Sequence, residues 1–244
     1  MSGVATPREL WVGLTHDTAH GPLAGILSIL TVIAGLVDAT SLLRLDRVFV
    51  ANVTGSVIFI GLALVGARGF SLAAPLIALA SFLIGAGIGV RVFARHVTHR
   101  GRSAYAACLA QFTDLLVASV IVLFDHHPTD PVRLTLVGIL ALGMGAKSAL
   151  VRSVNVPGLT TAVVTTTLTG LASEGATGSW RSTAFAVRLF ATCALLVGAI
   201  IGGALVVFVE RWTGLAAADV LALGAVFWAR SAARSDESWT IPSG

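Results

Sequence analysis

The sequence predicts an all-α, multi-pass membrane protein, and three observations support this fold class. Of the 244 residues, 56% are hydrophobic and only 11% are charged, and the mean hydropathy is +0.90. A soluble domain carries about 25% charged residues, so this chain has too few to cover a water-exposed surface. Several apolar runs reach the roughly 20 residues that cross a hydrocarbon core. They lack the alternation of a transmembrane barrel, so we expect helices.

The first half of the chain contains four apolar runs after a short mixed segment. Residues 1–20 are expected to form a loose tail or a helix lying on the membrane surface. Residues 21–43 are long enough to span. Residues 48–67 follow a break with two arginines, and residues 71–93 are rich in glycine. Residues 104–124 follow a basic loop and contain Gln111 and Asp114.

The second half shows the same order of elements. A proline suits the first turn of a helix over 131–150. The next segment, 159–174, is short and threonine-rich, and it starts after a Pro-Gly pair. Helices over 182–209 and 214–230 follow, each long enough to cross or nearly cross the bilayer. The polar tail, 231–244, is expected to be disordered or to lie at the surface.

Three collinear matches indicate an internal repeat of about 110 residues, covering 21–124 and 131–230. The matched pairs are AGLVDATS (34–41) with GMGAKSAL (143–150), ANVTG…GLA (51–63) with AVVTT…GLA (162–172), and LIGAGIG…F (83–93) with LVGAIIGG…F (196–208). If the short second segment of each repeat is a half-helix, the protein has six full crossings and inverted halves, which is a common transporter plan. If it spans, there are eight crossings and parallel halves.

Arginine placement favours six crossings with a cytoplasmic N-terminus, because cytoplasmic loops carry an excess of basic residues. This topology puts nine arginines inside and five outside, whereas the better eight-crossing orientation puts eight inside and six outside. The five on the outside are Arg44, Arg47, Arg68, Arg133 and Arg211. The length of segment 48–67 instead favours a full crossing by this segment, and so eight crossings. We therefore expect a multi-pass membrane protein with a cytoplasmic N-terminus.

Two charged residues within the apolar runs are the main candidates for a binding site. A carboxylate at depth normally faces a partner or water, so Asp38 is expected to bind a proton or ion, or else to cap the break that follows it. Lys147 is expected at the matching place in the second repeat. It would form an ion pair with Asp38 across the pseudo-twofold axis, attract an anion, or extend to the interface.

Short polar side chains at the start of both short segments could contact a polar or anionic solute, or could bond their own backbone instead. These candidates are Asn52, Thr54, Ser56, Thr161, Thr165 and Thr166, together with Gly55, which offers its backbone amide, and Ser148, which follows Lys147 in the preceding helix. Gln111 and Asp114, one turn apart, are secondary candidates. The Gly-x3-Gly faces of Gly85 with Gly89 and of Gly198 with Gly202 predict close helix packing.

The motifs GLVDA, FVANVTG and VPGLTTAVVTTTLTGLA together resemble the YoaK-type family of small bacterial membrane proteins, over roughly residues 20–230. That family has no established biochemical activity, so the resemblance implies fold and location more than function. The location it implies is the bacterial cytoplasmic (inner) membrane. The chain departs from the family pattern at four positions. It has Ser56 where Asn is usual, Lys147 and Ser148 where Gln and Asn are usual, and Thr166 where Gly is usual.

The function expected from these features is transport of a small polar or anionic solute. Transport coupled to proton movement is one form of this expectation. A channel or passive facilitator and a non-transporting assembly or regulatory protein are the alternatives. No nucleophile–base pair, nucleotide fingerprint or metal-ligand set is visible, so we expect no enzyme, cofactor or metal site. The bilayer is the expected partner, a homodimer is conceivable at this size, and the basic charge favours anionic lipid over nucleic acid.

Overall fold

The structure, a computed structural model, describes residues 21–93, 99–125, 127–154, 169, 172, 183–235 and 237–240. All of its regular elements in these ranges are helical, which confirms the predicted fold class. The elements are α2 (Leu23–Arg44), α3 (Val53–Leu64), α4 (Ala73–Phe93), α5 (Arg100–Phe124), α6 (Asp130–Val154), α8 (Thr183–Ala204), the π-helical turn η1 (Leu205–Val209), α9 (Thr213–Ala232) and the 3-10 turn η2 (Ser238–Thr240).

Six helices in the described ranges are long and apolar enough to cross a membrane, in agreement with the six-crossing prediction. They are α2, α4, α5, α6, α8 with η1, and α9. Large apolar side chains stay exposed along these helices, for example Leu83, Val117 and Ile200. In a bilayer such side chains contact lipid, so their exposure costs nothing there.

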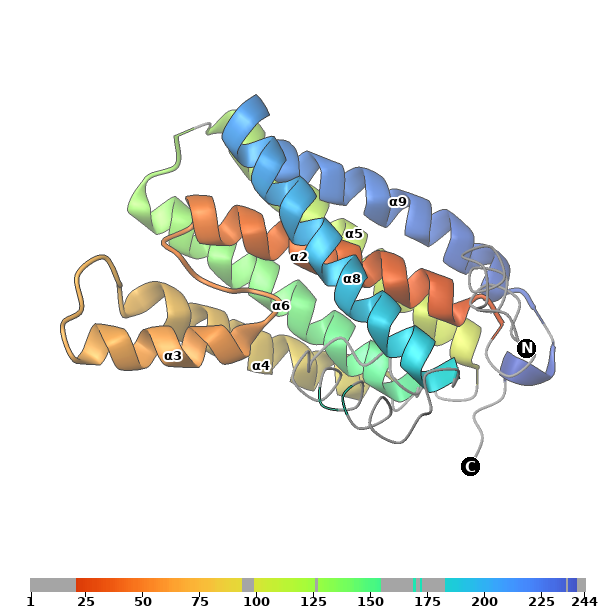
Figure 1. Ribbon diagram of the computed structural model, residues 1–244. Helices are drawn as coiled ribbons and strands as arrows, with labels where there is room; N and C mark the ends of the chain where they lie inside the picture. Colours follow the sequence, from red (N-terminus) through yellow and green to blue (C-terminus); the bar gives the residue numbers. More distant parts are fainter. Residues whose placement is uncertain are drawn as a thin grey trace, which may run out of the picture.

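Helix α3 is a half-helix. Its 12 residues extend for about 18 Å at 1.5 Å per residue, which is too short for a hydrocarbon core of about 30 Å. In Figure 1 the linker after α2 runs back into the bundle, and α3 then returns to the side on which α2 ended. Residues 45–64 are therefore re-entrant, and the eight-crossing alternative fails for this segment. The corresponding segment 159–174 lies outside the described residues, apart from residues 169 and 172.

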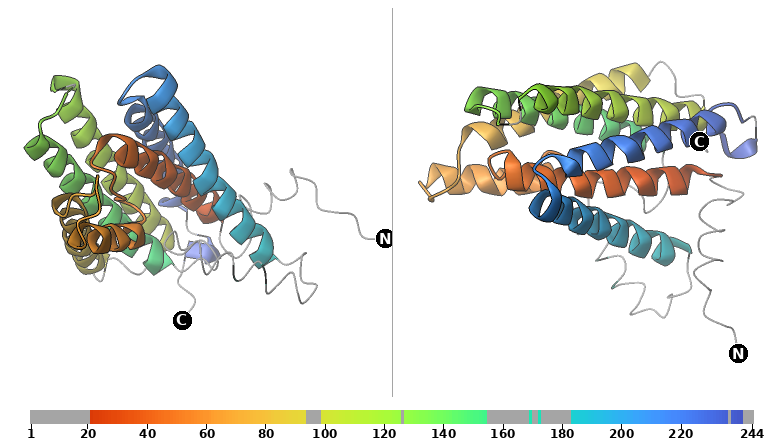
Figure 2. Two further views of the ribbon diagram at one scale, coloured as in Figure 1. Left: turned by 60° about the vertical axis from the view of Figure 1, so that its left-hand side comes forward. Right: turned by 90° about the horizontal axis from the view of Figure 1, so that it is seen from above.

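The helices pack in an exchanged order, because the third element of each half packs on the first element of the other. Helix α4 packs mainly on α6, and α8 packs mainly on α2. Helices α5 and α9 pack on each other between these two pairs. In both views of Figure 2, α4 and α8 lie on opposite sides of the bundle. Figure 1 shows that α2 and α6 run in opposite directions, as inverted halves would.

Glycines bring the backbones together at the first crossing, between α4 and α6. A Cβ on Gly85 would lie 2.0 Å from the carbonyl oxygen of Leu142, and one on Gly89 would lie 2.7 Å from that of Ala146. From the other side, a Cβ on Gly145 would lie 2.0 Å from the carbonyl oxygen of Phe82. No side chain fits at these points, so the predicted packing role of the first glycine face is observed.

The second crossing, between α2 and α8, repeats these contacts. A Cβ on Gly198 would lie 2.1 Å from the carbonyl oxygen of Val32, and one on Gly202 would lie 2.8 Å from Leu36. A Cβ on Gly35 would lie 2.3 Å from the carbonyl oxygen of Leu195. The two crossings match contact by contact, which is what two related halves predict. The descent of both halves from one repeat stays a prediction.

Candidate functional site

The carboxylate of Asp38 anchors the re-entrant segment. Oδ1 accepts hydrogen bonds from the backbone amides of Val50 at 2.9 Å and Ala51 at 2.8 Å. Oδ2 accepts from the backbone amide of Asn52 at 3.0 Å and from its side-chain amide at 2.6 Å. These amides belong to irregular backbone inside the bundle, where an unpaired group is costly. These bonds agree with the alternative prediction that Asp38 caps the break after its helix. Asn52 takes part in the same network and so has a structural role.

Other polar residues of this segment also bond within it. The Ser41 hydroxyl donates to the carbonyl of Val48 at 2.8 Å, and the Ser56 hydroxyl donates to that of Phe49 at 2.7 Å. Gly55 leaves room for the Phe49 ring, which a Cβ would approach to 2.4 Å. Thr54 is exposed. Of the predicted solute contacts in the first half, only Thr54 therefore has a side chain directed away from this internal network.

Lys147 is the largest fully buried polar side chain in the described part of the protein, with 1% of its surface exposed. Its Nζ donates to the carbonyl oxygen of Leu30 on α2 at the long distance of 3.5 Å. Lys147 and Asp38 form no direct ion pair among the described residues, because the Asp38 carboxylate bonds the linker. The two groups still interact electrostatically. Lys147 does not reach the interface either.

Helix α5 presents a polar face toward Lys147. The Asp114 carboxyl lies close enough to Lys147 for their charges to interact, and Cys108 and Gln111 precede it on the same face at three-residue spacing. The Asp114 carboxyl packs on Gly143, one turn before Lys147 on α6, where a Cβ would lie 2.1 Å from Cγ. We call Gln111, Asp114 and Lys147 the core cluster. Of the two secondary candidates, Asp114 therefore lies near Lys147, and Gln111 shares its face of α5.

The core cluster contains polar atoms without partners. Gln111 is fully buried, and neither its Oε1 nor its Nε2 has a hydrogen-bond partner within the described ranges. The same holds for Oδ2 of Asp114. Buried polar atoms are nearly always paired, so orphaned atoms beside a buried lysine indicate a place for water or a polar ligand. Ser148, the neighbour of Lys147, is half-buried on α6.

A second polar contact, between α5 and α9, was not among the predicted site residues. The Ser119 hydroxyl donates to Oδ2 of Asp219, while Oδ1 of Asp219 is buried without a partner in the described residues. Asp219 also interacts electrostatically with Asp114. Ser119 lines a 310 Å³ cavity that extends to Glu210, between α5 and the start of α9. The sequence signal was available, because Asp219 is also a carboxylate within an apolar run.

The remaining predicted residues cannot be placed. Thr161, Thr165 and Thr166 lie outside the described residues. Within the described ranges, no three His, Cys, Asp or Glu side chains gather in a way that could hold a metal ion.

Comparison with known proteins identifies the family. The chain is 27% identical over 149 residues to the UPF0700 transmembrane protein YoaK of Bacillus subtilis (strain 168), an alignment that covers 61% of this chain and 65% of the relative. No solved structure matches the chain. Residues 26–228 match the model of the DUF1275 family, described as a protein of unknown function. This match spans most of the chain, and the protein therefore belongs to the DUF1275 family of membrane proteins.

Proposed function

We propose that the protein moves a small anionic or polar solute across the membrane, with the core cluster as its binding site. One observation carries this proposal: Lys147 is 1% exposed inside a six-span bundle, and Gln111, on the face of α5 that also carries Asp114, is buried with polar atoms that have no partner in the described residues. A buried charge costs several kcal/mol unless it is paired. A buried lysine with one long backbone hydrogen bond stabilises the fold little, and its remaining N–H donors are available to an anion.

Asp114 supplies a way to couple the solute to a proton. When Asp114 is ionised, its negative charge offsets that of Lys147, and an anion gains little by binding. When Asp114 takes up a proton, the positive charge of Lys147 is left for an anion. Proton binding and anion binding therefore favour each other, and by linkage the effect is reciprocal. An anion would cross together with a proton.

The Ser119–Asp219 contact extends this scheme toward the membrane surface. The cavity beside Ser119 reaches Glu210, which follows η1. Ser119 bonds Asp219, and Asp219 interacts with Asp114. These groups form a series of proton-binding or proton-relaying side chains, as is common in proton-coupled transporters.

Uptake by proteoliposomes tests the proposal. We would supply labelled acetate, lactate, phosphate and sulfate to vesicles containing the full-length protein, with the outside acidic. We expect at least one anion to accumulate against its gradient, and Lys147→Gln to lower its uptake about tenfold or more, because a charged hydrogen-bond partner is lost. Asp114→Asn mimics the protonated acid, so it should retain anion exchange and lose uphill accumulation.

Two glycines on α6 provide a matched control. Gly143→Ala pushes against the Asp114 carboxyl, whereas a Cβ on Gly138 would lie 3.5 Å from its nearest neighbours, an ordinary contact. Gly143→Ala should impair coupling and Gly138→Ala should not. Transport that never runs uphill would favour the passive facilitator. Vesicles no more permeable than protein-free ones, or unchanged uptake by Lys147→Gln, would refute the proposed site.

A further inference from the structure

We propose that the protein carries a second, surface anion site, which binds the phosphate group of a free oxyanion or of a lipid headgroup. The site is a 240 Å³ cavity, here called the arginine pocket. It is lined by Arg44, His127, Pro128, Arg133, Arg211 and Trp212. This site is separate from the core cluster and does not depend on transport.

The basic residues of the arginine pocket come from four separate parts of the chain. Arg44 ends α2, His127 lies between α5 and α6, Arg133 lies in the first turns of α6, and Arg211 connects η1 to α9. All four parts lie at the end of the bundle where the re-entrant segment begins. Three like charges around one cavity repel one another, and a bound anion offsets that repulsion.

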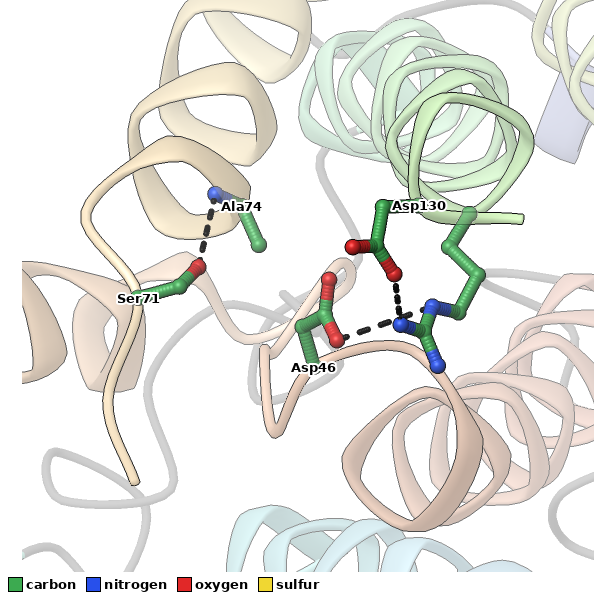
Figure 3. Close-up of polar contacts among 5 residues, drawn as sticks. Asp46, Ser71, Ala74 and Asp130 are labelled. Atoms are coloured by element: carbon green, nitrogen blue, oxygen red, sulfur yellow. Dashed lines mark hydrogen bonds and ion pairs between the residues drawn. The ribbon is translucent and has the colours of Figure 1, made fainter. Parts of the chain in front are cut away.

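One of the three arginines already has acidic partners. The Arg133 side chain bonds the Asp130 carboxylate, and its Nε lies 3.7 Å from Oδ1 of Asp46. Figure 3 shows the Asp46 and Asp130 carboxylates directed toward the same guanidinium group, beside the chain reversal that follows α2. Arg133 is thereby held in place, and its charge is offset within the protein.

The other two arginines keep their charge for a ligand. Arg44 donates from Nη2 to the carbonyl of Val206 at 3.0 Å, and its Nε is buried with no hydrogen-bond partner in the described ranges. Arg211 places Nη1 3.0 Å from Nδ1 of His127. Neither forms an ion pair with a carboxylate among the described residues. Two guanidinium groups with unused donors match the doubly charged, multiply accepting oxygens of a phosphate.

The size of the cavity fits this ligand class. A water molecule takes up about 30 Å³ in the liquid, so 240 Å³ accommodates a small oxyanion with several waters. Trp212 supplies an apolar wall, which lowers the local dielectric constant and strengthens the charge–charge attraction.

Calorimetric titration of inorganic phosphate into the full-length protein, in a neutral detergent, tests the free-ion source. We expect saturable binding that Arg44→Gln and Arg211→Gln each weaken about tenfold or more, since each removes a charge-assisted hydrogen bond. Arg68→Gln is the matched control, because it removes an exposed arginine outside the pocket. Arg44→Lys and Arg211→Lys keep the charge, so they should bind with intermediate affinity even if a glutamine variant fails to fold.

Native mass spectrometry of the protein in phosphatidylglycerol-containing nanodiscs tests the lipid source. Retention of phosphatidylglycerol that falls in the two pocket variants and not in Arg68→Gln, without binding of free phosphate, would identify a headgroup as the ligand. Binding of both probes that is unaffected by the pocket variants, or equally weakened by Arg68→Gln, would overturn the site, as would binding of neither probe.

Discussion

The Asp38 carboxylate accepts four hydrogen bonds from the three linker residues that precede α3. An ionised carboxylate has about four acceptor positions, so Asp38 uses nearly its whole capacity. This saturation explains why the side chain does not pair with Lys147. It also suits a residue whose role is to fix the backbone.

Asp38→Asn tests this anchoring role. The amide nitrogen of asparagine cannot accept, so up to two of the linker donors lose their partner inside the bundle. We expect the free energy of unfolding to fall by about 2 kcal/mol, measured by denaturation in detergent micelles. Asp125→Asn, in the loop after α5, is the control and should change stability little. Equal stability of both variants would contradict the anchoring role.

The charged residues of the site were visible in the sequence, and their contacts were not. Asp38 and Lys147 stand out because a charge in an apolar run is costly and needs a reason. Their partners depend on the path of the linker and on the packing of α5 on α6. The sequence predicts a solute contact for Ser56, because a hydroxyl near a chain break has several possible partners. Its bond to Phe49 follows from the tight return of the chain.

At the scale of the element, the reversal after α2 is made by two unusual residues. Asp46 has a φ of 56° and Arg47 a φ of 54°, both in the left-handed region. Two consecutive non-glycine residues rarely adopt this conformation. The contact between Asp46 and Arg133 helps to hold it, so the turn that sends the chain back into the bundle is tied to a residue that lines the arginine pocket.

Two glycines on α8, Gly198 and Gly203, allow the effect of helix packing to be separated from the effect of helix propensity. A Cβ on Gly198 would meet the α2 backbone at 2.1 Å, whereas one on Gly203 would have nothing within 4 Å. Gly198→Ala should lower the thermal midpoint in detergent, because the two helices must move apart. Gly203→Ala should leave it unchanged or raise it, since alanine favours a helix by up to about 1 kcal/mol. The reverse order would argue against the α2–α8 crossing.

At the scale of the whole molecule, the fold has a testable topology. The turn at Asp46 and the loop at Arg68 flank α3, and both should be accessible from outside the cell, whereas Arg91 should face the cytoplasm. Single cysteines at these positions, in a background with Cys193→Ser, can be labelled with a membrane-impermeant maleimide in intact cells. The re-entrant arrangement predicts labelling at positions 46 and 68 only. Labelling at one of positions 46 and 68 but not at the other would show that α3 crosses the membrane completely.

Much of this architecture follows from composition and length, because apolar runs of sufficient length must be helices in lipid. The sequence also singled out segment 48–67 through its Asn and Thr residues, although its length allowed a full crossing, and the half-helix predicted over 159–174 lies outside the described residues apart from 169 and 172. It did not reveal the exchanged packing of α4 on α6 and α8 on α2. That arrangement depends on which glycine faces meet, and Gly85 and Gly198 are equally suited to any close partner.

The exchanged packing has a consequence for biosynthesis. When a ribosome has delivered α2 to α5, neither α2 nor α4 has met the helix that covers its glycine face, because α8 and α6 are still unmade. The helices of the first half therefore stay in the bilayer without these packing partners, and in that state they are accessible to quality-control proteases. Only after α8 has entered do both crossings close. Its late insertion makes the folding of the two halves a single, mutually dependent event.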